Sequence, residues 1–375
     1  MHLKINRVLV KQLFGFLNYE LQFPESEQLI LTGPNGYGKT MLLKLIHHAI
    51  SDNYTELCKI NFKSFDLYTN HGHVRYFKNG SVLKVESFLY NSKRIVTYTP
   101  QHNVNDKVFD REVVRSILIN SVRLNNESES DNIITKQRHL LADKMKSAKK
   151  LIQLLDGLVI DLFSNIHKSN DNGIYEFLPE MISERIVGLQ KKLRPYAELG
   201  LLDNSSELIN ASTSQLYCLP NSTQVLSDKL AEIFYEISLH EDFIGRVMMF
   251  FSLITRKKFA FKTLYITPDV GFAFSNHNNT NIPLELLSSG EKNQISIFFD
   301  LIFKAENGTL ILIDEPEISL HISWQKNLLK EFSEIAKFNH YAQLIIATHS
   351  PDVINDEWDI SVDLYDMHKI DTGNK

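Results

Sequence analysis

The sequence predicts an α/β protein: a mixed, β-rich lobe and a parallel sheet, with a short helical arm inserted in the chain between them. Three observations support this fold class. An apolar strand at 28–32 leads into a glycine-rich loop and an amphipathic helix. Long helical stretches fill the middle of the chain, and strands alternate with helices after residue 290. Such alternation favours a parallel sheet with helices on its faces.

Composition is that of an ordinary globular protein with room for a large core. The 375 residues are 43% hydrophobic and 23% charged, which allows two or three compact units. The net charge of −5 argues against a general polyanion binder but leaves a local basic patch possible. The only cysteines, Cys58 and Cys218, are expected to be reduced thiols. No signal peptide or apolar stretch of about 18 residues occurs, so we expect a cytoplasmic protein without a membrane partner.

Three segments are predicted. The N-terminal lobe, 1–104, has strands at 3–10, 19–23 and 28–32, a helix from about 40 to 51, and alternating strands over 60–99. The helical arm, 105–256, has helices at 133–166, 180–194 and 223–256, the second ended by Pro195. The C-terminal lobe, 257–375, has a hairpin over 259–286, helices at 291–304 and 322–337, and strands at 309–313, 343–347 and 361–366.

The strongest motif fits the pattern G-x-x-x-x-G-K-[ST] and lies between a strand and a helix. Glycines let backbone N–H groups turn inward, and the helix N-terminus adds positive partial charge, so the pattern is typical of a phosphate cradle. Lys39 is expected to reach the β- and γ-phosphates of ATP, and Thr40 to hold Mg²⁺. The alternative is a glycine-rich turn that only enters a helix. The predicted nucleotide contacts here are Gly33, Pro34, Asn35, Gly36, Tyr37, Gly38, Lys39, Thr40 and Met41.

Two acids follow the apolar strand 310–313, at its carboxyl end, where open α/β sheets place their ligands. Asp314 is predicted to support Mg²⁺, largely through water. Glu315 is placed to polarise the water that attacks the γ-phosphate. The alternative is a pair of acids that merely caps a buried strand.

A third motif, Leu287-Ser288-Ser289-Gly290-Glu291, stands directly before a predicted helix. Its simplest interpretation is an N-cap with a glutamate in the first turn. Its functional interpretation is a second phosphate-binding helix terminus, offered to the nucleotide of another copy. The order of the motifs along the chain favours the second. The predicted contacts are Ser288, Ser289, Gly290 and Glu291.

The fourth element is His349, at the end of the apolar strand 344–346. In a parallel sheet this position is next to Asp314 and Glu315, from where a histidine can contact the γ-phosphate. A His-Ser-Pro turn is the plain alternative. The predicted catalytic residues are thus Lys39, Glu315 and His349, with ATP and Mg²⁺ as cofactors.

Together the four elements resemble the head domains of ABC ATPases. The stretch Asp314–His321, the serine-rich motif at 288–291 and Ala347–Pro351 look like the OLD/RecF branch of these heads. The phrase at 354–359, Ile-Asn-Asp-Glu-Trp-Asp, is similar to ATPase subunits of bacterial anti-phage systems such as Septu, PARIS and certain retron cassettes.

The resemblance implies an ABC head working as a head-to-head homodimer, or a higher oligomer, with ATP held between copies. It implies that Ser319, Leu320 and His321 form the loop that couples the two sites. It also implies that Gln101, at the end of the β-lobe, senses Mg²⁺ and water; the alternative is a polar residue at a strand end. Because the OLD nuclease domain is missing after the last strand, a nuclease or toxin effector would be a separate polypeptide.

Three functions remain open from the sequence. The first is an ATPase sensor or scaffold of an anti-phage complex that controls a separate effector. The second is a DNA-repair clamp of the RecF kind, activated by DNA. The third is a scaffold that binds ATP with little turnover.

Overall fold

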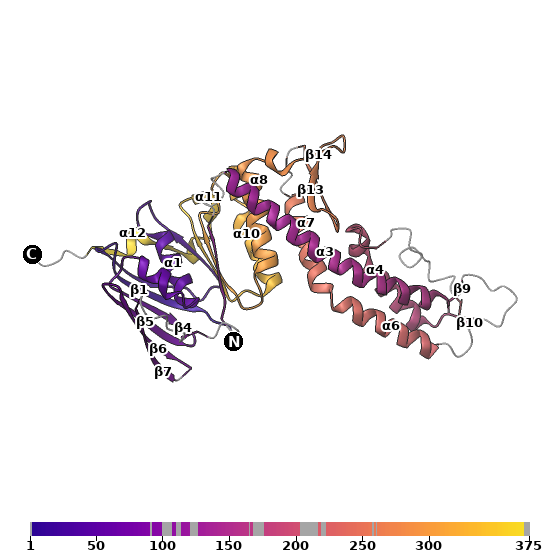
Figure 1. Ribbon diagram of the computed structural model, residues 1–375, viewed down its shortest axis with the longest axis horizontal. Helices are drawn as coiled ribbons and strands as arrows, with labels where there is room; N and C mark the ends of the chain where they lie inside the picture. The colour runs from indigo at the N-terminus through magenta and orange to yellow at the C-terminus, as the bar shows by residue number, and fades with distance from the viewer. Residues whose placement is uncertain are drawn as a thin grey trace, which may run out of the picture. The chain divides into compact units, whose positions relative to one another are not determined.

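The computed structural model divides into two compact units, Met1–Ser130 with Ser288–Lys375, and Asp131–Leu287 (Figure 1). It describes residues 2–90, 92–99, 107–109, 114–120, 127–164, 166–167, 176–202, 217–218, 223–256, 259 and 261–370. These boundaries differ from the arm predicted at 105–256. Ser116–Asn120 is a strand of the first unit's sheet, whereas the hairpin predicted over 259–286 packs with the arm helices.

The first unit contains a five-stranded parallel sheet that positions the predicted motifs. Its order is β17-β3-β16-β15-β8, and every neighbouring pair is parallel. The strands are β3 (Gln28–Thr32), β8 (Ser116–Asn120), β15 (Leu310–Asp314), β16 (Gln343–Ala347) and β17 (Ser361–Asp363). All residues of β15 and β16 are buried, which explains their continuous apolar sequences. The α/β fold class with a parallel sheet is therefore confirmed.

A seven-stranded antiparallel sheet forms the rest of the β-rich lobe, in the order β18-β2-β1-β4-β5-β6-β7. Its strands are β1 (Ile5–Leu13), β2 (Leu17–Gln22), β4 (Ser64–Thr69), β5 (Gly72–Asn79), β6 (Val82–Leu89), β7 (Ser92–Tyr98) and β18 (His368–Ile370). Helix α1 (Lys39–Ile50) lies between the two sheets (Figure 1), and its apolar residues join one core with both. The short helix α2 (Tyr54–Lys59) follows it.

The remaining helices of the first unit depart from the prediction in two places. They are α8 (Ser289–Phe299), a π-helical turn (Asp300–Lys304), α9 (Ile322–Gln325), α10 (Leu328–Asn339), α11 (Pro351–Ile354), a 3-10 turn (Trp358–Ile360) and α12 (Leu364–Met367). The single helix predicted at 322–337 is interrupted, because the Asn327 side chain donates to the Ser323 carbonyl and competes with the backbone ladder. The π-turn is stabilised by Asn339 and Tyr341, which both donate to the Leu301 carbonyl.

The second unit is mostly helical. It contains most of α3 (Glu127–Ser164), together with α4 (Glu180–Glu198), α6 (Thr223–Ser238) and α7 (Glu241–Arg256). A small sheet consists of β12 (Thr263–Thr267), β13 (Gly271–Ser275) and β14 (Asn281–Ile282), and a 3-10 turn (Leu284–Leu286) follows it. The short strands are β9 (Ile166–His167), β10 (Glu176–Phe177) and β11 (Tyr217–Cys218). In the described part of the chain, no helix is both long enough and apolar enough to cross a membrane.

Two predictions for the arm were wrong. Pro195 lies inside α4 and does not end it, because the buried side chains of Leu193, Tyr196 and Ala197 keep the last turn packed. The helix predicted at 223–256 is two helices, α6 and α7. The second one starts with two acids, Glu241 and Asp242, which favour a helix N-terminus.

Candidate nucleotide site

The glycine-rich loop curls around the ammonium group of Lys39. Gly33, Gly36 and Gly38 all have positive φ, at 134°, 89° and 81°, which other residues rarely adopt. The Lys39 side chain is buried, and its Nζ donates to the carbonyls of Gly33 at 2.6 Å and Pro34 at 3.3 Å. A Cβ at Gly36 would meet nothing within 4 Å, so this part of the loop faces open space.

Residues far away in the sequence support this loop. A Cβ at Gly38 would come within 2.9 Å of Leu13 and 3.3 Å of Phe14, so the β1–β2 turn lies directly against the loop. The Tyr19 hydroxyl donates to the Tyr37 carbonyl at 2.6 Å, and burial raises the pKa of Tyr19 to about 12, which keeps it a donor.

The C-terminal segment also reaches the loop. The Tyr37 ring contacts the rings of Tyr365 and His368, with centroids 5.6 and 5.3 Å apart. A Cβ at Gly33 would approach Asp363 at 3.2 Å. Sequence reasoning missed this support, because no local pattern links residues 363–368 to residue 33.

A hydrogen bond joins the loop to the end of β15. The Thr40 hydroxyl donates to Asp314 Oδ1 at 3.1 Å. Asp314 is buried, and burial raises the pKa of its carboxyl group, while the Thr40 hydroxyl acts in the opposite direction. A hydroxyl and a carboxylate side by side are the hard oxygen ligands that Mg²⁺ prefers, so the residues present fit this ion.

Glu315 and His349 lie together at the carboxyl ends of β15 and β16. Glu315 has a positive φ of 48°, and its backbone N–H donates to the Ala347 carbonyl at 2.8 Å. Its Oε1 is 3.8 Å from Nδ1 of His349. Both side chains are partly exposed, at 23% for Glu315 and 49% for His349, so both are open to a ligand.

A third acid, Glu317, lies beneath this pair and was not singled out from the sequence. Its side chain is only 5% exposed. Its Oε1 accepts hydrogen bonds from the Thr348 hydroxyl at 2.6 Å and the His349 backbone N–H at 3.2 Å. The same oxygen is 3.3 Å from Nδ1 of His349. In the sequence, the only sign of this role was the position of Glu317, two residues after Glu315 in the stretch Asp-Glu-Pro-Glu.

The serine-rich motif forms the N-terminus of α8 as a capping box. The Ser288 hydroxyl accepts from the Glu291 backbone N–H at 3.3 Å, and the Glu291 carboxylate accepts from the Ser288 N–H at 2.8 Å. Helix capping, the plain interpretation, is thus present. It does not exclude phosphate binding, because a hydroxyl that accepts one bond keeps its own hydrogen to donate. Ser289 is the first residue of the helix.

The start of α8 lies against the segment that follows β15. A Cβ at Gly290 would come within 2.4 Å of the Ser319 carbonyl oxygen, which leaves room only for glycine. One turn later, the Asn293 side-chain amide donates to the carbonyls of Ile318 at 2.9 Å and Pro316 at 3.2 Å. Within this unit, the motif therefore lies against segment 316–319, which directly follows the two acids.

Beside the phosphate loop, a hollow of about 800 Å³ runs along α1. Among its lining residues are Met41, predicted as a nucleotide contact, and Phe14 and Lys44, which were not. Phe14 is 39% exposed, in a turn that also carries an exposed Phe16. The two aromatic residues in this turn were the only hint of the hollow in the sequence.

Gln101, the predicted Mg²⁺ sensor, lies outside the described residues.

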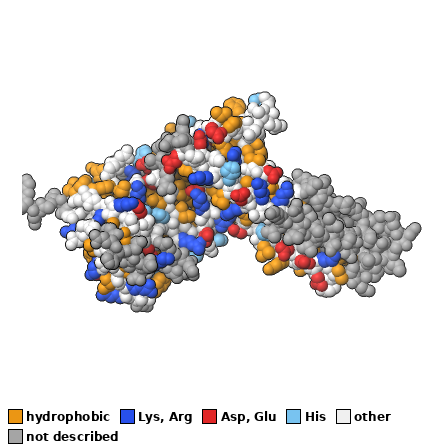
Figure 2. Space-filling view, in the orientation of Figure 1, with side chains coloured by type: hydrophobic (Ala, Val, Ile, Leu, Met, Phe, Trp, Pro, Cys, Tyr) orange, Lys and Arg blue, Asp and Glu red, His pale blue; other side chains and the backbone are white. Residues whose placement is uncertain are grey.

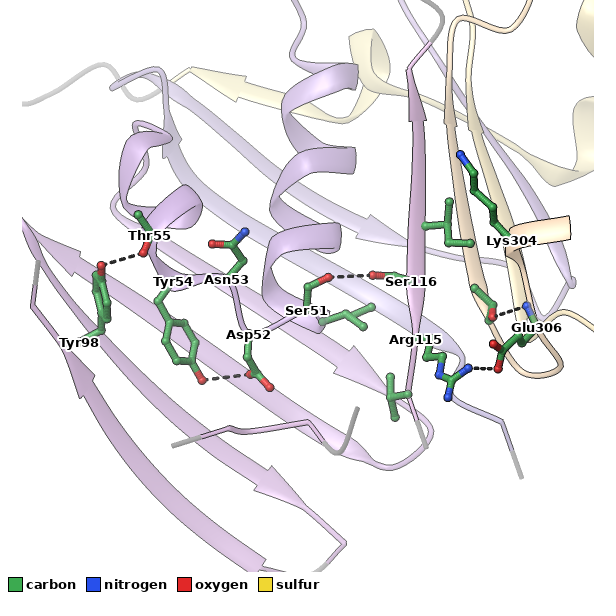
Figure 3. Close-up of a pocket in the computed structure, with 14 residues that line it drawn as sticks. Ser51, Asp52, Asn53, Tyr54, Thr55, Tyr98, Arg115, Ser116, Lys304 and Glu306 are labelled. Carbon is green, nitrogen blue, oxygen red and sulfur yellow. Dashed lines mark hydrogen bonds and ion pairs between the residues drawn. The ribbon is translucent and has the colours of Figure 1, made fainter. Parts of the chain in front are cut away.

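A second hollow of about 710 Å³ lies at the other end of α1 and takes no part in this arrangement (Figure 3). Its acidic group, Asp52, accepts hydrogen bonds from the Tyr54 hydroxyl and the backbone of Val108 and Phe109. Arg115 and Glu306 form an ion pair across it. These polar groups therefore hold the fold together at the amino ends of β8 and β15.

Comparison with known families decides which kind of protein carries this site. The profile of the family described as "AAA domain, putative AbiEii toxin, Type IV TA system" matches residues 29–355, which is most of the chain and includes all four motifs. The chain belongs to this AAA-domain family.

A curated protein to which the chain is similar is the "Retron Ec83 probable ATPase" of Escherichia coli. It is 32% identical over 87 residues, which is 20% of this chain and 16% of the relative. The chain thus matches about one sixth of that protein's length.

Among solved structures, the chain is similar to two Smc head domains. One, from Pyrococcus furiosus, has an extended coiled coil and is bound to the C-terminal domain of ScpA; it covers 94% of this chain and 91% of its own, with a TM-score of 0.44 and 14% identity. The other, bound to the winged-helix domain of ScpA, has the same coverage, a TM-score of 0.40 and 13% identity. Likeness at this level carries no inference about function.

Proposed function

We propose that this protein binds and hydrolyses ATP as a nucleotide-gated dimer of ABC-type heads. The observation that carries the proposal is the hydrogen bond between Thr40 and Asp314, with Glu315 and His349 beside it. It joins the phosphate cradle to the acids at the end of β15, which is the arrangement that phosphoryl transfer needs. Membership of an AAA-domain family supports it.

Each side chain has a distinct task in the proposed reaction. Lys39 exchanges its contacts with the loop carbonyls for the β- and γ-phosphates. Mg²⁺, when held by Thr40 and Asp314, supplies charge neutralisation of the phosphates. Glu315 orients the attacking water and accepts its proton, and His349 donates to the γ-phosphate. The chemistry is positioning and charge stabilisation, with no covalent intermediate on the protein.

The start of α8 serves the nucleotide of the second copy. Ser288, Ser289 and Gly290 offer a hydroxyl and backbone N–H groups at a helix N-terminus, which bind anions. ATP then holds two heads together, because its γ-phosphate is satisfied only when both faces are present. Hydrolysis removes that charge and weakens the dimer, which makes the protein a switch.

We further propose that this switch controls a separate effector, a nuclease or toxin of an anti-phage system. The similarity of residues 354–359 to ATPase subunits of anti-phage systems, and the 32% identity over 87 residues with the retron ATPase, support this role. The RecF-like DNA clamp is the alternative. On the face shown in Figure 2, Lys and Arg side chains are interspersed with acidic ones, and the net charge is −5, so bulk charge does not favour DNA.

The test uses Glu315→Gln in the native host, trapped with ATP and Mg²⁺. Loss of a general base lowers turnover by about 10²- to 10⁴-fold, while ATP binding and the closed dimer should persist. A stoichiometric nuclease or toxin that co-purifies with the trapped protein, and is absent with Lys39→Ala, supports the effector role. DNA that is released by high salt supports the clamp instead. A monomer that still holds ATP contradicts the dimer, and a wild type that binds ATP without hydrolysis contradicts the ATPase.

A further inference from the structure

Two carboxyl groups, those of Glu315 and Glu317, approach the same ring nitrogen of His349, but they differ in their exposure to solvent. Glu315 Oε1 is 3.8 Å from Nδ1, and Glu317 Oε1 is 3.3 Å from it. Glu315 is open to a ligand, whereas Glu317 is buried under the loop. The proposed reaction uses Glu315 on the water, so Glu317 is left without an assigned task.

Glu317 accepts hydrogen bonds from the histidine loop and lies close to the His349 ring as well. Its Oε1 accepts from the Thr348 hydroxyl and from the His349 N–H. The Thr348 oxygen in turn accepts from the Ser350 N–H at 3.0 Å. One carboxyl oxygen thus fixes three successive residues, and His349 is the middle one.

A purely structural role would not require an acid in this place. The other oxygen of Glu317, Oε2, is buried and has no hydrogen-bond partner among the described residues. An unpartnered buried acceptor is unfavourable, and such groups are uncommon in folded proteins unless they have a task. A glutamine would satisfy the backbone of this loop with its neutral amide oxygen and would not bury a carboxylate.

We propose that Glu317 is a positioning residue for His349. It turns the Nδ1 side of the imidazole toward the interior, which leaves Nε2 to face the γ-phosphate. The histidine is thereby held in one orientation before ATP arrives, as the partners of catalytic histidines do in other enzymes. The inference rests on the proposed function, since His349 matters only if its nucleotide is hydrolysed.

The position of Glu317 also connects His349 to the start of α8. Glu317 lies between Pro316 and Ile318, whose carbonyls accept the Asn293 amide. A single segment, 316–318, touches both the helix and the histidine loop.

The experiment is a double-mutant cycle on the full chain, with Glu317→Gln, His349→Gln and both together. Glutamine keeps the shape of Glu317 and an oxygen that accepts from Thr348, but it removes the negative charge that faces Nδ1. We expect Glu317→Gln to lower kcat for ATP by about 10- to 100-fold, the range found for partners of catalytic ligands. KM and ATP affinity should stay within about threefold, because the phosphate loop is untouched.

The double variant decides between a role through His349 and an independent role. If Glu317 acts through His349, the double variant has the kcat of His349→Gln alone, within about threefold. A kcat reduced by the product of the two single effects overturns the proposal. A Glu317→Gln variant with wild-type kcat also overturns it.

A second pair of variants avoids the acid, in case Glu317→Gln does not fold. Thr348→Val removes the hydroxyl that donates to Glu317 and preserves the volume, whereas Thr348→Ser keeps the hydroxyl. We expect a lower kcat with unchanged KM for valine and a nearly normal kcat for serine; equal rates in both variants would count against the proposal. Failure of wild type to hydrolyse ATP would be a failure of the proposed function, and it is seen in the same assay.

Discussion

The phosphate loop differs from the segments that follow β15 and β16 at the carboxyl end of the sheet, which we call the catalytic edge. The contacts that hold these two regions join different parts of the chain. In the loop, residues 33–40, the key contacts are local: the Lys39 ammonium group reaches carbonyls five and six residues earlier. At the edge, residues 315–321 and 348–350, each important contact joins segments about 20 to 35 residues apart. The contacts of Lys39 come from the loop's own sequence, with Phe14 and Tyr19 supporting the loop from outside, whereas the edge receives its geometry from α8 and β16.

This difference predicts two classes of variant. Changes in the loop should weaken ATP binding, and turnover should fall as a consequence. Changes in the contacts that hold the edge should spare binding and lower turnover at saturating ATP. Each variant below tests this separation.

Lys39→Ala should have the largest effect. The substitution removes both hydrogen bonds to the loop and the cation for the β- and γ-phosphates. Charge-assisted hydrogen bonds to two phosphates, at about 1.5–3 kcal/mol each, correspond to an ATP affinity at least about 100-fold lower in their absence. Calorimetry with ATP and Mg²⁺ measures it, and Lys63→Ala, an exposed lysine of the same unit, is the control. Normal affinity in Lys39→Ala would refute the loop as the phosphate site.

The sequence predicted the local contacts of the phosphate loop better than the long-range contacts of the edge. The motif at 33–40 could be read directly, since its glycines and lysine act through neighbouring residues. The burial of β15 and β16 could also be predicted, because apolar runs followed by polar side chains mark the ends of parallel strands. Strand β8 escaped prediction, because its apolar run of three residues, 117–119, is too short to show a distinctive periodicity.

What could not be predicted depends on tertiary contacts. Glu317 looks like any acid in a turn until Thr348 and His349 are brought beside it. Phe14 and Tyr365 join the phosphate loop only through the folded sheet. Glu291 had a predicted nucleotide contact, whereas in the structure its carboxylate caps α8. Its role toward ATP stays a prediction.

Gly290→Ala tests the edge at its tightest point. The new Cβ would lie 2.4 Å from the Ser319 carbonyl, so the segment after β15 must move. A displacement of about 1 Å at a catalytic group can cost about 100-fold, and we expect turnover at saturating ATP to fall 10- to 100-fold. The affinity of a single head for ATP should change by less than about threefold, because Gly290 serves the nucleotide of the other copy.

Gly188→Ala is the matched control, because this glycine is also helical. Its Cβ would approach only Phe234, at an ordinary 3.9 Å. The control should keep wild-type turnover and gain up to about 1 kcal/mol in stability. An equal loss of ATP affinity and turnover in Gly290→Ala would show that loop and edge are not separate.

Phe14→Ala sharpens the boundary between the two regions, because Phe14 contacts the loop at Gly38 and lines the hollow along α1. If the base of ATP stacks on this ring, its loss removes about 1–3 kcal/mol and raises KM about tenfold, with kcat unchanged. Steady-state kinetics measure both constants. Phe77→Ala, an exposed ring on β5, should leave both unchanged. A lower kcat with normal KM in Phe14→Ala would show that Phe14 affects turnover, as the residues of the edge do, and does not affect ATP binding.

Asn293→Ala should have the smallest effect and is the most selective test, because the chain offers a close counterpart. Asn293 and Asn339 are both buried, and each side-chain amide donates to two backbone carbonyls. Asn293 holds the catalytic edge at Pro316 and Ile318, whereas Asn339 holds the π-turn at Leu301 and Ile302. Either substitution should destabilise the fold by about 1–3 kcal/mol.

Only one of the two should affect the reaction. Asn293→Ala frees the segment that carries Glu317, so we expect single-turnover hydrolysis to slow by about three- to tenfold. Asn339→Ala should hydrolyse ATP within about twofold of wild type at the same loss of melting temperature. If both variants slow hydrolysis equally, the rate depends on the overall stability of the fold, and the contact of Asn293 with segment 316–318 has no specific role in the reaction. If only Asn293→Ala slows hydrolysis, α8 acts on Glu317 and the histidine loop through this one amide.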